Sequence, residues 1–226
     1  MAHLQGKSVP TRFGIVVFPG FQALDAFGPL DALNSLAYYF PLDLSIIAAT
    51  MDPVSTRPPN APPQGNFSES IVPTHTFETA PPLDVLIVPG GRGTKDINVV
   101  QGVIDFVAKV YPSLKYLITV CTGSGIAARA GVLDGRRATT NKKAWAETTA
   151  LRTEVKWVAH ARWVVDGNIW TSSGVSAGLD VIFAFMEDVF GKEAADNVAN
   201  GLEYERHTDS TWDPYAKIYN LKDSDA

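Results

Sequence analysis

Cys121 is the only cysteine of the 226-residue chain, and its surroundings predict a reactive thiol. The apolar run "YLITV" precedes it, and the small residues Gly-Ser-Gly follow it at 123–125. This order predicts a strand, a sharp turn and a helix, the layout of a nucleophile elbow that lifts a side chain above a sheet. The N–H groups at the start of that helix would favour the thiolate, the reactive form. The alternative is a buried structural cysteine, but burial alone does not explain the small residues after it.

Asp25, in "ALDAFGPLDAL", is the second candidate. We expect it on or just before the first turn of the helix that follows the first strand. A carboxyl group that faces a thiolate can hold a proton and hand it on, and burial beside a negative charge raises its pKa. The alternative is a helix cap, a position that aspartate fills well. Asp31 lacks this placement and is expected on the surface.

Gly90 and Gly91 belong to a third unusual loop, "VPGGRGT". It lacks the third glycine of a dinucleotide-binding loop and the Gly-Lys-Ser/Thr of a P-loop. A tight turn whose N–H groups face the site is therefore favoured over a phosphate loop, and no cofactor is predicted. The four histidines are scattered without metal-ligand spacing, so no metal site is predicted either. His160 lies in a strand-like segment and is expected to be a strand residue rather than a base.

The elements that would position these residues alternate along the chain. Apolar runs rich in β-branched residues predict strands within 12–20, 42–50, 83–91 and 114–120. Apolar residues at helical spacing predict helices at 24–39, 99–111, 123–130, 177–189 and 192–206, and Asp166-Gly167-Asn168 predicts a hairpin turn. This alternation predicts an α/β protein with a parallel sheet covered on both faces. The carboxyl ends of its strands would then bring the three loops together.

Composition limits the class of protein. The net charge is -5 with interspersed signs and no basic stripe, so a nucleic-acid partner is not expected. No apolar stretch approaches the roughly 18 residues of a membrane span. One cysteine cannot form an internal disulfide, and the start of the chain lacks a signal-peptide core, so we expect a cytoplasmic protein. We expect one domain over residues 1–226, with a core at about 12–206, an irregular proline-rich loop at 51–66 and a polar C-terminal tail.

Four segments together resemble the ThiJ/PfpI superfamily, and within it the isonitrile hydratase branch. They are "GIVVFPGFQALDAFGPLDAL", "DVLIVPGG", "VCTGSGIAARAGVLDGRRATTN" and "ARWVVDGNIWTSSGVSAGLD", and "TWDPYA" near the end also fits. The resemblance implies a flavodoxin-like three-layer α/β sandwich, usually dimeric, with Cys121 as the nucleophile. It implies that Asp25 replaces the glutamate of many members, that Thr122 is the residue beside the nucleophile, and that Gly90 and Gly91 form a substrate-binding turn of backbone donors. Apolar residues near the first helix, such as Phe21 and Phe27, would support a dimer if they reach the surface.

The chain departs from the superfamily pattern at Asn141, where many members carry a histidine. This departure removes the usual candidate base and argues against peptidase-like chemistry. Related cores also occur as the sensing half of transcription regulators. Those proteins carry a helix-turn-helix region afterwards, for which the residues after Val189 are too few.

The resemblance favours hydration of an isonitrile, R–NC, to an N-substituted formamide. Cys121 would form a thioimidate, with Asp25 as general acid and base and no metal or organic cofactor. One alternative is glutathione-independent, glyoxalase-type hydration of methylglyoxal, for which Asn141 is a handicap. The other is a non-enzymatic redox sensor or stress protein in which Cys121 is oxidised.

Overall fold

The computed structural model describes residues 9–62 and 65–223, and within them seven strands form one sheet. Every neighbouring pair in this sheet is parallel except β10 and β11, which form an antiparallel hairpin. In order across the sheet the strands are β10 (Trp163–Asp166), β11 (Ile169–Ser172), β7 (Tyr116–Thr119), β6 (Val85–Val88), β1 (Arg12–Val16), β2 (Asp43–Ala48) and β5 (His75–Thr76).

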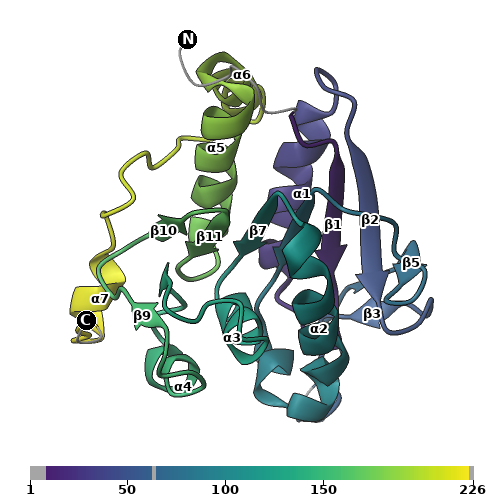
Figure 1. Cartoon of the computed structure of the whole chain (residues 1–226), viewed down its shortest axis with the longest axis vertical. Helices are drawn as coiled ribbons and strands as arrows, with labels where there is room; N and C mark the ends of the chain where they lie inside the picture. Colours follow the sequence, from purple (N-terminus) through teal and green to yellow (C-terminus); the bar gives the residue numbers. More distant parts are fainter. Residues whose placement is uncertain (1–8, 63–64, 224–226) are drawn as a thin grey trace.

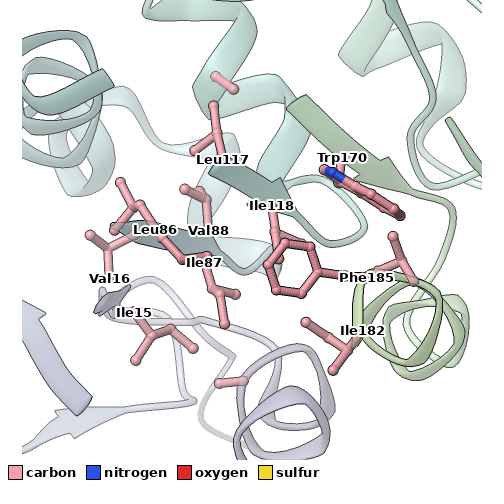
Figure 2. Close-up of a cluster of buried hydrophobic side chains, with 14 of the residues drawn as sticks. Ile15, Val16, Leu86, Ile87, Val88, Leu117, Ile118, Trp170, Ile182 and Phe185 are labelled. Atoms are coloured by element: carbon pink, nitrogen blue, oxygen red, sulfur yellow. The ribbon is translucent and has the colours of Figure 1, made fainter. Parts of the chain in front are cut away.

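Helices cover both faces of the sheet. Helices α1, α5 and α6 contact one another, and α2 contacts α3. Figure 2 shows α1 (purple) and α5 (green) on one side of the strands and teal helices on the other. The helices are α1 (Ala23–Leu36), α2 (Ile97–Val110), α3 (Gly123–Arg129), α4 (Trp145–Thr149), α5 (Ala177–Phe190), α6 (Lys192–Gly201) and α7 (Pro214–Ile218), with 3-10 turns η1 (Arg92–Lys95) and η2 (Tyr111–Ser113).

The core is built from the central strands, whose side chains alternate between the two faces. Ile15, Ile87 and Ile118 are in register on β1, β6 and β7, and all three are fully buried. In Figure 2 they point to the side where Ile182 and Phe185 of α5 lie. Because both faces of these strands are buried, their sequences are continuously apolar instead of alternating.

The fold class predicted from the sequence is confirmed. Each predicted strand range contains one strand of the sheet, and the hairpin turns at Gly167 as expected. The last predicted helix is shorter than expected, because α6 ends at Gly201. The sequence missed short elements: β5, α4, and the two-stranded sheets β3–β4 (Val54–Ser55 with Ser70–Ile71) and β8–β9 (Arg137–Ala138 with Lys156–Trp157).

The C-terminal segment was predicted to be a polar tail, and its described part contains α7. Figure 1 shows this yellow segment leaving α6 and running down the molecule towards β9. Ala216 of α7 is fully buried, and Asp213 accepts hydrogen bonds from the backbone at the start of the helix. No helix within the described ranges is long and apolar enough to cross a membrane.

Candidate active site

Cys121 lies at the sharp turn between β7 and α3, as the elbow predicts. Its φ angle is +58°, a left-handed conformation that non-glycine residues rarely adopt and that often marks functional sites. Its N–H donates to the Ser173 carbonyl at 3.0 Å, and its own carbonyl accepts from the hydroxyls of Ser124 and Thr140, both at 3.1 Å. A Cβ at Gly123 would lie 2.2 Å from the Val88 carbonyl oxygen. The glycine two residues after Cys121 is therefore a packing requirement of the turn.

Asp25 is the third residue of α1 and is completely buried beneath the elbow. Its Oδ2 accepts from the Gly90 N–H at 2.9 Å, whereas its buried Oδ1 has no hydrogen-bond partner of regular geometry among the described residues. The N-cap of α1 is Gln22, so the helix-cap alternative for Asp25 is wrong. Asp31, six residues later on α1, is exposed as predicted.

The carboxyl of Asp25 and the thiol of Cys121 perturb each other. Burial raises the pKa of Asp25 to about 7, against smaller opposing effects of the Gly90 N–H and the Cys121 thiol. Burial and the negative charge of Asp25 raise the pKa of Cys121 to about 12. Near neutral pH the pair therefore holds a thiol beside a carboxyl group that is ready to gain or lose a proton.

The expectation that the elbow favours a thiolate is corrected by this result. The backbone N–H groups of Val175 and Thr122 do lower the pKa of the thiol, as does the amide of Asn141. Their effect is smaller than that of burial, because Cys121 is only 5% exposed. The N–H donors of the turn therefore lower the pKa of Cys121 as expected, but desolvation raises it by more.

Asn141 stands directly beside the sulfur. Its Nδ2 donates to the Cys121 Sγ at 3.2 Å, while its Oδ1 accepts from the Ala144 N–H at 3.1 Å. The backbone donor at Ala144 fixes which end of the amide faces the thiol. Where the sequence showed only a missing histidine, Asn141 thus supplies a hydrogen-bond donor to the thiol of Cys121 and no base.

Thr122 and the glycine turn form one hydrogen-bonded unit. The Gly91 N–H donates to the Thr122 Oγ1 at 3.0 Å, and the Thr94 hydroxyl contacts the same oxygen at 3.1 Å. The Gly90 N–H is taken by Asp25, so both N–H groups of the turn hold side chains of the site. A Cβ at Gly90 would lie 2.5 Å from the Thr122 nitrogen, so this approach requires glycine. The substrate-binding role of the two glycines stays a prediction.

A cavity of about 850 Å³ opens above Cys121. It lies between η1, one face of α3 and the segment around α4. No histidine is among the residues that line it: Gln22, Gly91, Arg92, Thr94, Lys95, Cys121, Thr122, Gly125, Arg129, Asn141, Lys143, Ala144, Glu147, Thr148, Leu151 and Val175. The thiol of Cys121 is therefore buried from bulk water, yet it faces a space that can hold a small molecule.

The structure brings together every residue that the sequence singled out for chemistry, and it adds a buried ion pair. Lys142 and Asp213 are both nearly inaccessible, with Nζ 3.4 Å from Oδ2. Asp213 also accepts from the Ser173 hydroxyl at 3.0 Å, and the Ser173 carbonyl is the partner of the Cys121 N–H. The pair thus ties the C-terminal segment to the elbow. His160 is exposed and lies in no strand.

No described part of the chain groups three or more His, Cys, Asp or Glu side chains in a way that could hold a metal ion.

Comparison with known proteins gives one family. The model of the DJ-1/PfpI family matches residues 11–188. Isonitrile hydratase from Pseudomonas putida is 34% identical over 193 residues, which cover 85% of this chain and 78% of that protein. A deglycase from Pyrococcus horikoshii is 32% identical over 55% of this chain and 72% of its own length. The crystal structure of a ThiJ/PfpI family protein from Pseudomonas syringae covers 97% of this chain and 92% of its own, with a TM-score of 0.69 and 27% identity.

Proposed function

The chain belongs to the DJ-1/PfpI family, and on that basis we propose that it is an isonitrile hydratase-like hydro-lyase that converts R–NC and water into an N-substituted formamide. The observation that carries the proposal is the buried pair of Asp25 and Cys121, whose cysteine lines a cavity with no histidine in its described lining. This pair holds a nucleophile and a mobile proton at one point. An isonitrile needs both at one atom, because its terminal carbon gains a sulfur and a hydrogen in the same addition.

The first step forms the thioimidate. The Asp25 carboxylate takes the proton of the Cys121 thiol while the sulfur attacks the terminal carbon, and Asp25 then passes that proton to the same carbon. The product is R–N=CH–S–Cys121, and Asp25 is again a carboxylate. A carboxyl group with a pKa of about 7 suits both transfers near neutral pH.

The second step releases the formamide. Asp25 takes a proton from a water molecule that attacks the thioimidate carbon, and the nitrogen receives that proton. The tetrahedral intermediate R–NH–CH(OH)–S–Cys121 then collapses to R–NH–CHO, and its hydroxyl proton returns through Asp25 to the sulfur. The donor amide of Asn141, 3.2 Å from the sulfur, stabilises negative charge on it in both steps.

The alternatives receive less support from this geometry. Redox-sensing cysteines are accessible and have a low pKa, whereas Cys121 is buried and its pKa is raised to about 12. Glyoxalase-type hydration would use a base beside the thiol, and Asn141 occupies the position of the family's histidine without being able to accept a proton.

Purified protein incubated with p-nitrophenyl isocyanide tests the proposal. We expect the formamide as product, and a mass increase on Cys121 equal to one substrate when the reaction is quenched early. Cys121→Ser should lose nearly all turnover and still fold, because an unassisted hydroxyl is a far poorer nucleophile. Turnover of methylglyoxal to lactate without turnover of the isonitrile would replace this proposal by the glyoxalase reading.

We also propose that the protein acts as a homodimer in the cytoplasm, where its free thiol stays reduced. Phe21 is buried and cannot support a dimer, but Leu24 and Phe27 of α1 are 41% and 36% exposed. Together with Leu44 and Leu202 they line an apolar groove that a second copy would cover. Sedimentation at micromolar concentration tests this, and a single species of 24.4 kDa would contradict it.

A further inference from the structure

The cavity above Cys121 carries a charge opposite to that of the whole chain. The protein has a net charge of -5, yet the cavity lining contains four cationic side chains and one carboxylate. The carboxylate, Glu147 of α4, forms an ion pair of 2.6 Å with Lys95 of η1. The other three cations are Arg92, Arg129 and Lys143, and none of them has a carboxylate partner among the described residues.

Arg129 is the most constrained of the three. It is half-buried at the end of α3, and Nη1 donates to the Thr94 carbonyl at 2.9 Å. Burial lowers its pKa, and no anion opposes that effect. The guanidinium of Arg129 is partly withdrawn from water, and its hydrogen bond goes to one neutral carbonyl. Its remaining N–H donors can therefore bind a ligand, and their planar arrangement matches a carboxylate or phosphate.

Thr122, the residue beside Cys121, and Arg129 lie along one face of α3. Thr122, Gly125 and Arg129 are spaced by three and four residues, so they follow one another on the same side of α3, and all three line the cavity. The rise of a helix separates the Cα atoms of residues 122 and 129 by about 10 Å along the axis. A Cβ at Gly125 would lie 3.1 Å from the side chains of Thr148 and Leu151, so these two side chains pack against the glycine between the two ends.

We propose that the substrate is an anionic isonitrile, with its R–NC carbon at Cys121 and a carboxylate or phosphate at Arg129, supported by Arg92 and Lys143. This inference rests on the proposed hydratase function and specifies its substrate class. A neutral isonitrile of the same shape would leave the three cations without a partner. An anionic one gains a charge-assisted hydrogen bond at Arg129.

The test compares 4-isocyanobenzoate with the isosteric neutral 4-isocyanobenzamide. We expect wild-type kcat/KM to favour the carboxylate by about tenfold or more, the factor of one charge-assisted hydrogen bond, and added salt to reduce this ratio. Arg129→Gln should abolish most of the preference, and Arg129→Lys should retain part of it. Lys109→Gln removes an exposed cation outside the cavity lining and should leave the ratio unchanged. A third probe, 4-isocyanophenyl phosphate, shows which anion the site prefers.

The ratio separates charge recognition from a structural effect of Arg129 on Thr94, because such an effect would slow both substrates alike. Equal rates for acid and amide in the wild type, or a preference that survives Arg129→Gln, would overturn this inference while leaving the hydratase proposal intact. If no isonitrile reacts, the hydratase proposal fails. Calorimetric binding of 4-isocyanobenzoate and its amide to Cys121→Ser then decides the charge preference separately, and equal affinities overturn it.

Discussion

Asp25→Asn separates proton transfer from the shape of the site. Asparagine is nearly isosteric, so its side-chain oxygen can still accept from the Gly90 N–H that lies 2.9 Å from Oδ2. The variant loses the group that takes and returns protons, and general acid–base groups contribute about 10²–10⁴-fold. We expect turnover of p-nitrophenyl isocyanide to fall by that factor. Asp25→Glu keeps the acid and should retain more turnover, although a misplacement of about 1 Å can still cost on the order of 100-fold.

The same substitution should make Cys121 easier to ionise. Burial is the first cause of its high pKa, and the charge of Asp25 is the second. Removing that charge lowers the pKa, and at a fixed pH well below it each unit of lowering raises the thiolate fraction about tenfold. Alkylation by iodoacetamide, which requires the thiolate, should therefore accelerate. Turnover and thiol reactivity would then move in opposite directions. Unfolding of the site would have the same two effects, so an unchanged circular dichroism spectrum must show that the variant is folded.

The matched control is Asp31→Asn, which makes the same chemical change on the same helix at an exposed position. It should leave both turnover and alkylation at wild-type rates. Turnover is measured by formamide formation, and alkylation by the mass of the intact protein over time. If folded Asp25→Asn keeps turnover within about threefold of wild type, far from the acid–base factor, Asp25 does not carry the proton. If its alkylation slows, the charge of Asp25 does not oppose the thiolate.

Three further predictions follow from the contacts of the site. Asn141→Leu removes the donor to the sulfur, so the pKa of Cys121 should rise and alkylation should slow by about tenfold, the effect of one hydrogen bond; an unchanged rate would contradict this role. Asp213→Asn leaves Lys142 buried without its counter-ion, so the free energy of unfolding in urea should fall by on the order of 3 kcal/mol. Asp209→Asn, at an exposed position, should change it little. The pKa of Asp25 is raised from 3.8 to about 7 in the folded protein, so the wild type loses stability as the pH rises between these values. Above pH 7, Asp25→Asn should therefore be more stable than the wild type by on the order of 4 kcal/mol. Equal urea midpoints of the two proteins at pH 8 would refute this.

The sequence predicted the large elements because their patterns are long enough to read. The strands around Ile15, Ile87 and Ile118 are continuously apolar, as strands buried on both faces are. The two-residue strand β5 and the five-residue helix α4 are too short to show any periodicity. Their positions depend on pairing and packing with distant segments, which no local pattern carries.

The site was predictable to the same degree. The elbow around Cys121 has a local signature, because the turn itself needs small residues. The upward shift of the pKa of Cys121 has no local signature, because desolvation depends on all the residues that pack around the thiol. Asn141 contributes through a segment twenty residues away in the chain, and no spacing rule connects the two. Its only signal in the sequence was a departure from the family's histidine.

The raised pKa of Cys121 is consistent with the chemistry proposed for it. A preformed thiolate would supply the sulfur for the isonitrile carbon but no proton, and the described cavity lining holds no histidine to supply one. A thiol beside the Asp25 carboxylate supplies both, because the proton that leaves the sulfur is the proton that the carbon requires. Burial thus opposes a free thiolate at Cys121. It also raises the pKa of Asp25 to about 7, so Asp25 can accept the proton of the thiol and pass it to the isonitrile carbon. Mutations that expose the elbow to water should therefore raise the alkylation rate of Cys121 without raising turnover.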